Sequence, residues 1–174
     1  LRQIADHGFN FLRVPMSTEI LLQWKNGDPD PATPKVNEYS NPELTVEGVQ
    51  GGTIKYSFDI WNQAVEWCRE LGIKIMIDIH SAETASAGHQ VSLWYTDKFS
   101  TEDWCDALAW FADYYKDDDT ILAIDLKNEP HGTADVKDKM AKWDDSTDST
   151  NWKYAAETCA ARVLEQNPNL LIMV

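Results

Sequence analysis

The sequence predicts an α/β fold whose strands run parallel. Short apolar runs alternate with segments of helical periodicity, in the order (α)βαβαβαβ. The strands are almost continuously apolar, which is typical of strands that are covered on both faces of a sheet. A helical segment connects each strand to the next, and crossovers of that kind join parallel strands. The 174 residues are enough for one domain with a sizeable core.

The first third of the chain predicts a helix end, a strand and a long loop. Residues 1–7 have the pattern of a helix end, which Gly8 terminates because glycine accepts the left-handed conformation needed there. A strand is expected from Phe9 to Met16. Residues 24–53 are polar and rich in proline and glycine. We therefore expect a long loop there, and long loops in compact domains are often functional.

The middle of the chain predicts a helix, a buried strand and a second helix. The first helix covers residues 57–71 and ends at Gly72. The strand over residues 73–80 is almost entirely apolar. Ser100 and Asp103 have the spacing of a capping box, which indicates where the second helix begins. The side chains expected to be buried are Trp61, Ala64, Cys68 and Leu71 in the first helix, and Trp104, Leu108, Phe111 and Tyr115 in the second.

The last third predicts a strand, a polar loop, a helix and a final strand. The first of these strands covers residues 121–126, and the polar loop extends to Thr150. Pro168 ends the helix because proline cannot continue one. The final strand is expected over residues 170–174. The buried face of the helix is expected to comprise Trp152, Ala155, Ala156, Cys159 and Val163.

The composition argues against several classes of function. There are 29 acidic and 15 basic residues, so the net charge is −14, which argues against nucleic acid and anionic membrane surfaces as partners. No apolar run reaches the roughly 18 residues that span a bilayer. No signal-peptide pattern opens the chain. Because the sequence starts at Leu1 without Met and stops at Val174 within an apolar run, we expect it to be a piece of a larger domain.

The three cysteines indicate no cofactor site. Three is an odd number, so at least one thiol is unpaired within this chain. Cys68, Cys105 and Cys159 all fall in predicted helices, where we expect them to be buried like small apolar side chains. Cys-x-x-Cys and His-Glu-x-x-His motifs are both absent from the sequence, so zinc has no obvious ligand set.

The positions of the polar residues favour a (β/α)8 barrel over a doubly wound sheet. A doubly wound nucleotide-binding fold would carry a Gly-rich turn after a strand, and the sequence has none. It also lacks the G-x-S-x-G motif of serine hydrolases of the nucleophile-elbow type. Instead, Arg13, His80 and the pair Asn128–Glu129 lie at or near the carboxyl ends of predicted strands. That end of a barrel carries the active site.

Glu129 is the strongest candidate for chemistry among these residues. A carboxyl group at the mouth of an apolar barrel can have a raised pKa, which makes it a proton donor near neutral pH. Arg13 can keep a neighbouring carboxylate ionised, which suits a carboxylate that must act as a nucleophile. His80 can donate a hydrogen bond to a substrate hydroxyl.

Three other charged residues lie near the strand ends and are not assigned to the chemistry. Asp78 and Asp125 lie deeper in their strands, where paired charges inside the barrel are the expected arrangement. Lys127 would lower the pKa of Glu129 if it reached that carboxylate. We therefore expect Lys127 to point elsewhere.

Five motifs, in this order along the whole chain, resemble those of glycoside hydrolase family 5, and in particular the bacterial endo-1,4-β-glucanases. Asn-Glu-Pro alone recurs across related barrel glycosidases, so the ordered set carries the resemblance. The motifs are Phe11-Leu-Arg-Val-Pro15, Asp78-Ile-His80, Leu93-Trp-Tyr-Thr96, Asp125-Leu-Lys-Asn-Glu-Pro-His131 and Asn167-Pro-Asn-Leu-Leu-Ile172.

The resemblance implies a (β/α)8 barrel that hydrolyses β-glycosidic bonds with retention and needs no metal or other cofactor. The chain would hold a partial barrel, about strands two to five, so that residues 1–174 are a partial catalytic domain. Glu129 would be the general acid/base, and Asn128 would contact the sugar 2-hydroxyl. The nucleophilic glutamate of the family lies on the seventh strand. No residue of this chain corresponds to it, so the isolated chain should not hydrolyse substrate efficiently.

The resemblance also implies supporting residues. Arg13 would lie near the nucleophile, and His80 would line the subsite before the cleaved bond. Trp94 belongs to the Trp-Tyr loop of the family, where it either contacts sugar or anchors the loop. His131 follows Glu-Pro as in similar family members and is a candidate substrate contact.

Several readings of the function stay open from the sequence. The first is an endo-1,4-β-glucanase that is secreted, acts on a β-1,4-glucan, and is a monomer as a whole enzyme. A second is an endo-β-mannanase or another β-glycanase of the same fold. A third is a non-catalytic carbohydrate-binding barrel, and a fourth is an α/β structural or signalling domain. The acidic composition suits a protein that acts on a neutral polysaccharide, because such a substrate demands no basic patch.

Overall fold

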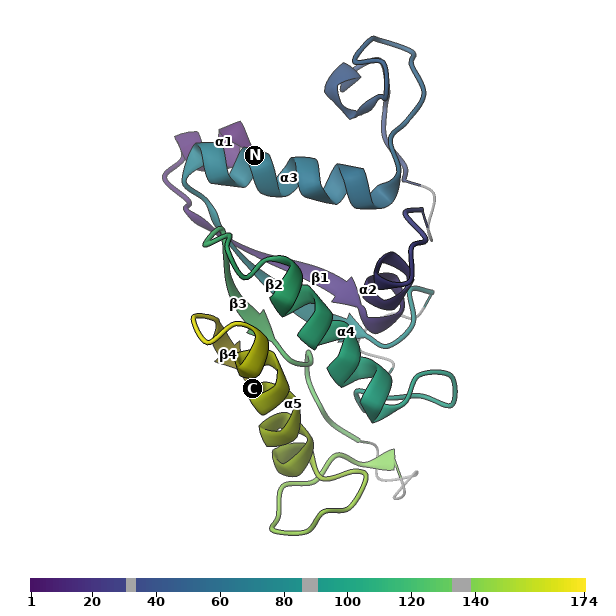
Figure 1. Cartoon of the computed structure of the whole chain (residues 1–174), viewed down its shortest axis with the longest axis vertical. Coiled ribbons are helices and arrows are strands. Elements are labelled where there is room, and N and C mark those ends of the chain that lie inside the picture. The colour runs from purple at the N-terminus through teal and green to yellow at the C-terminus, as the bar shows by residue number, and fades with distance from the viewer. Residues whose placement is uncertain (31–33, 86–90, 133–138) are drawn as a thin grey trace.

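The computed structural model describes residues 1–30, 34–85, 91–132 and 139–174. The secondary structure alternates as the sequence predicts (Figure 1). The elements are α1 (Arg2–Asp6), β1 (Phe11–Ser17), α2 (Thr18–Lys25), the 3-10 turn η1 (Pro42–Leu44), α3 (Ser57–Leu71), β2 (Lys74–Ser81), α4 (Thr101–Tyr114), β3 (Ile121–Asp125), α5 (Trp152–Gln166) and β4 (Leu171–Met173).

The four strands form one parallel sheet in the order β1-β2-β3-β4. Consecutive strands are neighbours, and the segments that connect them contain helices (Figure 1). This is the arrangement of part of a (β/α)8 barrel, so the predicted fold class is confirmed. Because all four strands are parallel, their carboxyl ends lie at the same edge of the sheet. Side chains that follow each strand are therefore brought together.

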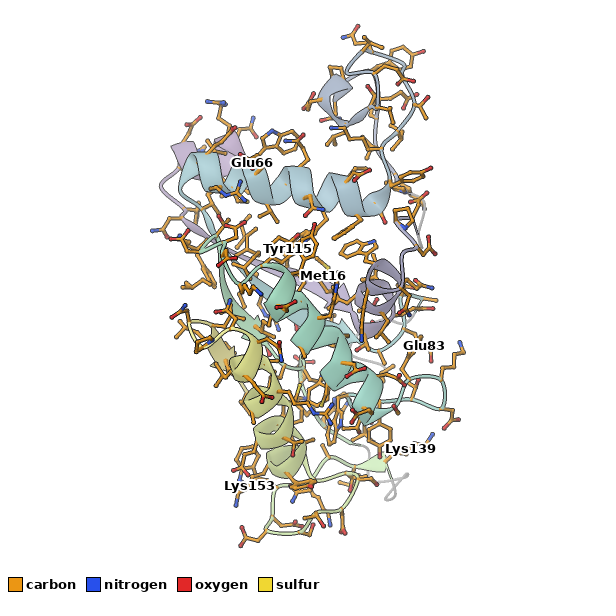
Figure 2. All side chains as sticks on the ribbon, in the orientation of Figure 1. Met16, Glu66, Glu83, Tyr115, Lys139 and Lys153 are labelled. Carbon is orange, nitrogen blue, oxygen red and sulfur yellow. The ribbon has the colours of Figure 1, made fainter. Side chains whose placement is uncertain are left out.

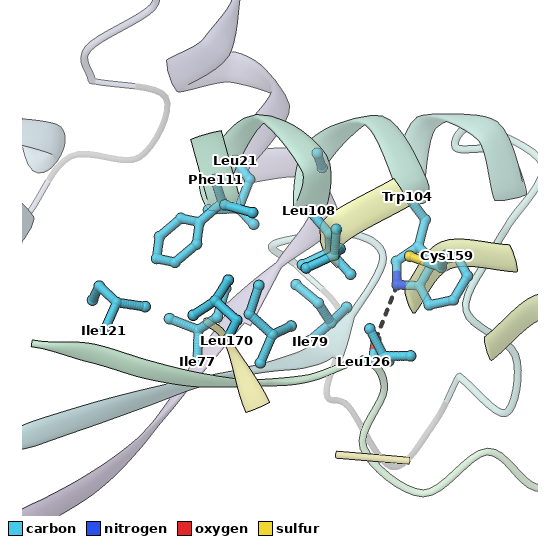
Figure 3. Packing of buried hydrophobic residues seen from close by; sticks show 14 of the residues in the cluster. Leu21, Ile77, Ile79, Trp104, Leu108, Phe111, Ile121, Leu126, Cys159 and Leu170 are labelled. Carbon is cyan, nitrogen blue, oxygen red and sulfur yellow. Dashed lines mark hydrogen bonds between the residues drawn. The ribbon is translucent and has the colours of Figure 1, made fainter. Parts of the chain in front are cut away.

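The strand register gives the sheet one apolar face and one face that carries charges. Val14, Ile77, Ile124 and Ile172 form one row across the sheet, and the two central isoleucines are completely buried. In Figure 3, Ile77 lies beneath side chains of α4. The next row is Pro15, Asp78, Asp125 and Met173. Since successive side chains of a strand point to opposite faces, these carboxylates lie on the face away from the helices.

The helix boundaries follow the signals in the sequence. Gly72 ends α3 in the left-handed conformation (φ 69°). Ser100 and Asp103 form the expected capping box at the start of α4, with both reciprocal hydrogen bonds present. Cys68, Cys105 and Cys159 are buried free thiols, as predicted. None of the helices in the described ranges is both long enough and apolar enough to cross a membrane.

The structure differs from the prediction in three places. Thr18–Lys25 forms α2, which the sequence analysis did not predict. Ser17 caps this helix, because its side chain accepts a hydrogen bond from the Ile20 N–H (3.1 Å). The helix has only eight residues, so its apolar pattern in the sequence is short. In α3 the buried face includes Val65, while Ala64 and Leu71 are only partly buried. The predicted loop after α2 is present but contains η1, and its residues 31–33 lie outside the described residues.

Trp104 of α4 fixes the chain at the end of β3. Its side chain is completely buried, and its indole Nε1 donates to the carbonyl oxygen of Leu126 (2.9 Å), as Figure 3 shows. Trp94 and Trp152 pack against the same indole, with ring centroids 6.0 and 5.8 Å away. The hydrogen bond therefore satisfies a buried carbonyl just before the residues expected to do chemistry.

We expect Trp104→Phe to destabilise the whole protein by about 1–3 kcal/mol, because the Leu126 carbonyl would be left buried without a donor. Urea unfolding of the purified variant measures this loss. Trp152→Phe is the matched control, since its buried indole forms no hydrogen bond with any residue of the described ranges. If the two variants lose the same stability, ring volume and not the hydrogen bond explains the effect.

Candidate active site

Residues from three strands meet at the carboxyl edge of the sheet. Arg13 comes from β1, Asp78 and His80 come from β2, and Asp125 is the last residue of β3. Asn128 lies three residues after Asp125, and its backbone N–H donates to the carbonyl oxygen of Ile79 (2.9 Å). This bond continues the pairing of β3 with β2 beyond the end of the strand. The polar residues picked out at predicted strand ends are therefore brought to one place.

Arg13 joins the three strand ends through its guanidinium group. One terminal nitrogen lies 3.0 Å from Asp78 Oδ2, and the other lies 2.9 Å from Asp125 Oδ2. The second nitrogen also donates to Asn128 Oδ1 (2.9 Å). Asp78 and Asp125 are thus paired inside the sheet, as expected from the sequence. The planar guanidinium fixes the relative positions of all three partners.

Asp78 is completely buried and orients His80. His80 Nδ1 donates to Asp78 Oδ2 (2.6 Å), because an ionised carboxylate can only accept. Burial raises the pKa of the Asp78 carboxyl, while the hydrogen bond from His80 and the charge of Arg13 lower it. The bond leaves Nε2 of the half-buried His80 ring as the atom available to a ligand. Asp78 therefore has an orienting role in addition to the structural one predicted from sequence.

The contact with Arg13 also determines which way the Asn128 amide faces. A guanidinium has no acceptor, so the atom of Asn128 that meets it must be the carbonyl oxygen. The amide nitrogen is consequently the donor that Asn128 can present to a ligand. This arrangement suits hydrogen bonding to a substrate hydroxyl.

Glu129 adopts a left-handed backbone conformation with φ 48°, the only positive φ of a non-glycine residue in the described ranges. Such a conformation is strained and persists only where the surroundings enforce it. His131 contributes by donating from Nδ1 to the Glu129 carbonyl oxygen (2.5 Å), and its own N–H donates to the Ser92 carbonyl (3.0 Å). Glu129 is exposed, so the burial expected at a barrel mouth does not occur among the described residues.

Lys127 is almost completely buried, with 2% of its surface exposed. Its ammonium group contacts the carbonyl oxygen of Asn128 and lies 3.5 Å from that of His80. Burial lowers the pKa of Lys127 to about 8, although the charges of Asp78, Glu129 and Asp125 raise it. The ammonium group thus contacts backbone oxygens, while the charge of Glu129 still raises its pKa. Sequence reasoning predicted no role for this residue.

Trp94 does not present a surface to sugar. It is 1% exposed, its Nε1 donates to Thr101 Oγ1 (3.0 Å), and its ring packs against Trp152 at 5.1 Å. A sugar needs an open aromatic face, which a side chain enclosed in this way does not offer. Of the two roles considered for Trp94, the structure contradicts sugar stacking and supports anchoring of the loop to α4 and α5.

A pocket of about 440 Å³ lies on the loop that follows β2. Ser92, whose carbonyl accepts from His131, is part of its lining, so the pocket adjoins the Glu129 turn. Glu83 and Lys139, which also line it, are labelled in Figure 2. Within the described ranges, no group of three or more His, Cys, Asp or Glu side chains is placed to hold a metal ion.

Comparison with known proteins gives consistent matches along the chain. A family model described as Cellulase (glycosyl hydrolase family 5) matches residues 1–174. Endoglucanase G of Acetivibrio thermocellus is 48% identical over 189 residues, covering 100% of this chain and 33% of that protein. The major extracellular endoglucanase of Xanthomonas campestris pv. campestris is 31% identical over 172 residues, covering 99% of this chain and 31% of that protein.

A solved structure agrees with the sequence matches. A complex of an endocellulase from Pyrococcus horikoshii with cellotetraose superposes with a TM-score of 0.78 at 28% identity. It covers 98% of this chain and 42% of that chain. The chain therefore spans about a third of the length of the curated relatives named above and less than half of the solved structure.

Proposed function

The chain belongs to the cellulase family, glycosyl hydrolase family 5, and we propose that the whole protein is an endo-acting, retaining endo-1,4-β-glucanase that cleaves internal bonds of cellulose or related glucans. Residues 1–174 would be part of its catalytic domain. The observation that carries this proposal is the arrangement of Asn128 and Glu129, which places an oriented amide donor next to a carboxyl group at the carboxyl edge of the sheet.

Glu129 would act as the general acid/base. In a retaining glycosidase, one carboxylic acid protonates the leaving oxygen, and a second carboxylate about 5 to 5.5 Å away attacks the sugar. The same residue then removes a proton from the water that hydrolyses the glycosyl-enzyme. The second carboxylate would come from a part of the protein outside this chain. Retention therefore requires the whole protein.

The neighbouring residues would bind and orient the sugar. The Asn128 amide nitrogen would donate to the 2-hydroxyl, a contact that strengthens as the oxocarbenium-like transition state forms. His80, oriented by Asp78, would present Nε2 to the subsite before the cleaved bond. Arg13 would bring positive charge near the nucleophile while it holds Asn128. His131 supports the backbone of Glu129, and this contact makes it a positioning residue in the proposal.

The proposal includes the setting in which the protein acts. Its substrate would be a neutral polysaccharide, its partners would not include nucleic acid or membrane, and the whole enzyme would be a monomer. We also propose that it acts outside the cell, since polymeric cellulose does not enter cells. The name of the Xanthomonas campestris relative, which calls that protein extracellular, supports this proposal.

Substrate preference tests the proposal directly. We expect the purified whole protein to release reducing sugar from carboxymethylcellulose at least about tenfold faster than from β-mannan or xylan. Polar groups placed for the equatorial 2-hydroxyl of glucose would be left unpaired by mannose, and those placed for its 6-hydroxyl would be left unpaired by xylose. A preference for mannan would instead assign the protein as an endo-β-mannanase. Glucan binding without hydrolysis would assign it as a carbohydrate-binding barrel.

A further inference from the structure

The burial of Lys127 needs a structural reason. Lysine is almost never fully buried unless it is paired, and Lys127 is among the largest fully buried side chains of the described residues. Its ammonium group is directed at two backbone oxygens, those of Asn128 and His80. One of them belongs to the turn that carries Glu129, and the other belongs to the end of β2. The side chain therefore links two strand ends.

The charged groups around Lys127 come from every strand that forms the site. Asp78 faces it from β2, Asp125 from β3 and Glu129 from the turn, while Arg13 on β1 binds the two aspartates. His80 meets it through its backbone carbonyl. Two cations thus face three carboxylates in this cluster. Arg13 directs its donors at Asp78, Asp125 and the Asn128 side chain. Lys127 is the cation that reaches the backbone of the turn.

We propose that Lys127 is a positioning residue whose ammonium group holds the Asn128–Glu129 peptide in place and thereby aims the Glu129 carboxyl group. The inference rests on the proposed function, in which Glu129 is the acid/base. A peptide unit is planar, so fixing the Asn128 carbonyl also fixes the nitrogen of Glu129. His131 fixes the next peptide plane through the Glu129 carbonyl. The two contacts together maintain the left-handed conformation between them.

The test compares substrates that differ only in whether the leaving group needs a proton. In the whole protein we expect Lys127→Met to lower kcat/KM for cellotetraose about 100-fold, since a small misplacement of a catalytic group costs that much. For 2,4-dinitrophenyl β-cellobioside, whose leaving group departs without protonation, the loss should stay below about fivefold. Equal losses on both substrates would show that the substitution damages the site generally, and this would overturn the proposal.

Two further variants make the result interpretable. Lys74→Met is the matched control, because Lys74 lies at the opposite end of β2 and its ammonium bonds Asp119. It should leave both rates unchanged. Lys127→Gln keeps an N–H donor without the charge, so its loss on cellotetraose should be intermediate. If Lys127→Met does not fold, as judged by its melting temperature, Lys127→Gln carries the test in its place.

The pH dependence provides a second readout. Above about pH 8 the buried ammonium loses its proton and with it its charge. The wild-type kcat/KM for cellotetraose should therefore show an extra fall near that pH, limited to the roughly 100-fold that Lys127→Met loses at every pH, so the ratio of the two rates should shrink as the pH rises. A ratio that stays constant from about pH 6 to about pH 9 would overturn the positioning role. An inactive wild type, or a fully active Glu129→Gln, would instead overturn the proposed function itself.

Discussion

Replacing Glu129 by Gln should lower kcat/KM for cellotetraose by about 10²- to 10⁴-fold in the whole protein, the range that one general acid/base supplies. Gln keeps the length of the side chain and the backbone at φ 48° but cannot donate the proton that the leaving sugar needs. Binding should persist, because the contacts of Asn128 and His80 are unchanged. KM should therefore change much less than kcat.

The control is a carboxylate of the same chain that lies away from the site. Glu66, which is labelled in Figure 2, lies on α3, and its exposed carboxylate pairs with Arg69. Glu66→Gln should leave the rate within about twofold, as surface changes usually do. A parallel reaction without protein would show whether any residual hydrolysis is enzymatic. Full activity of Glu129→Gln would show that Glu129 is not the general acid/base of this protein.

Most of the fold could be predicted because local and long-range signals agree. The helix over residues 57–71 has both a clear apolar face and a glycine at its end, and the structure reproduces its bounds. The capping box at Ser100 is similarly local. The helix α2 was missed because two turns carry too few apolar positions to show a period, and it follows β1 without a break. Only the packing of Leu21 and Trp24 into the core reveals it.

The candidate site could be predicted only where position along a strand determines where a side chain lies. Arg13, His80, Asn128 and Glu129 were found because parallel strands bring their carboxyl ends together. Trp94 could not be assigned, since a tryptophan in a loop pattern suits both a core and a sugar face. Its burial decides between them, and burial depends on α4, which begins seven residues later, and on α5, which lies far away in the sequence. The sequence likewise does not predict the contact between Lys127 and the Asn128 carbonyl, which depends on how the chain turns after β3.

Removing the guanidinium group should have the second large effect, on stability as well as rate. We expect Arg13→Met to lower the free energy of unfolding of the whole protein by about 2–4 kcal/mol, because completely buried Asp78 loses its cation. Removing one partner of a buried ion pair typically costs about 3–5 kcal/mol. The loss expected here is somewhat smaller because the Arg13 side chain is itself 39% exposed. We also expect kcat to fall about 100-fold, since Asn128 loses the partner that orients its amide.

The pH dependence of the stability loss identifies its cause. Burial already raises the pKa of the Asp78 carboxyl above its unfolded value, and the charge of Arg13 opposes this shift together with His80. Removing Arg13 should therefore raise that pKa further. The native state then binds a proton that the unfolded state releases, so stability falls as pH rises between the two pKa values. The deficit of Arg13→Met should consequently shrink at acidic pH. Equal deficits at pH 5 and pH 8 in urea unfolding would contradict this account.

A double variant separates stability from positioning. Asp78→Asn removes the buried charge but keeps an oxygen that can accept from His80 Nδ1. In the Arg13→Met background it should recover more than half of the lost stability, because the unpaired charge is gone. Activity should stay low, because the Asn128 amide still lacks its guanidinium partner. If stability and activity recovered together, Arg13 would serve only to neutralise Asp78. The orientation of Asn128 would then have to come from its backbone hydrogen bond to Ile79 alone.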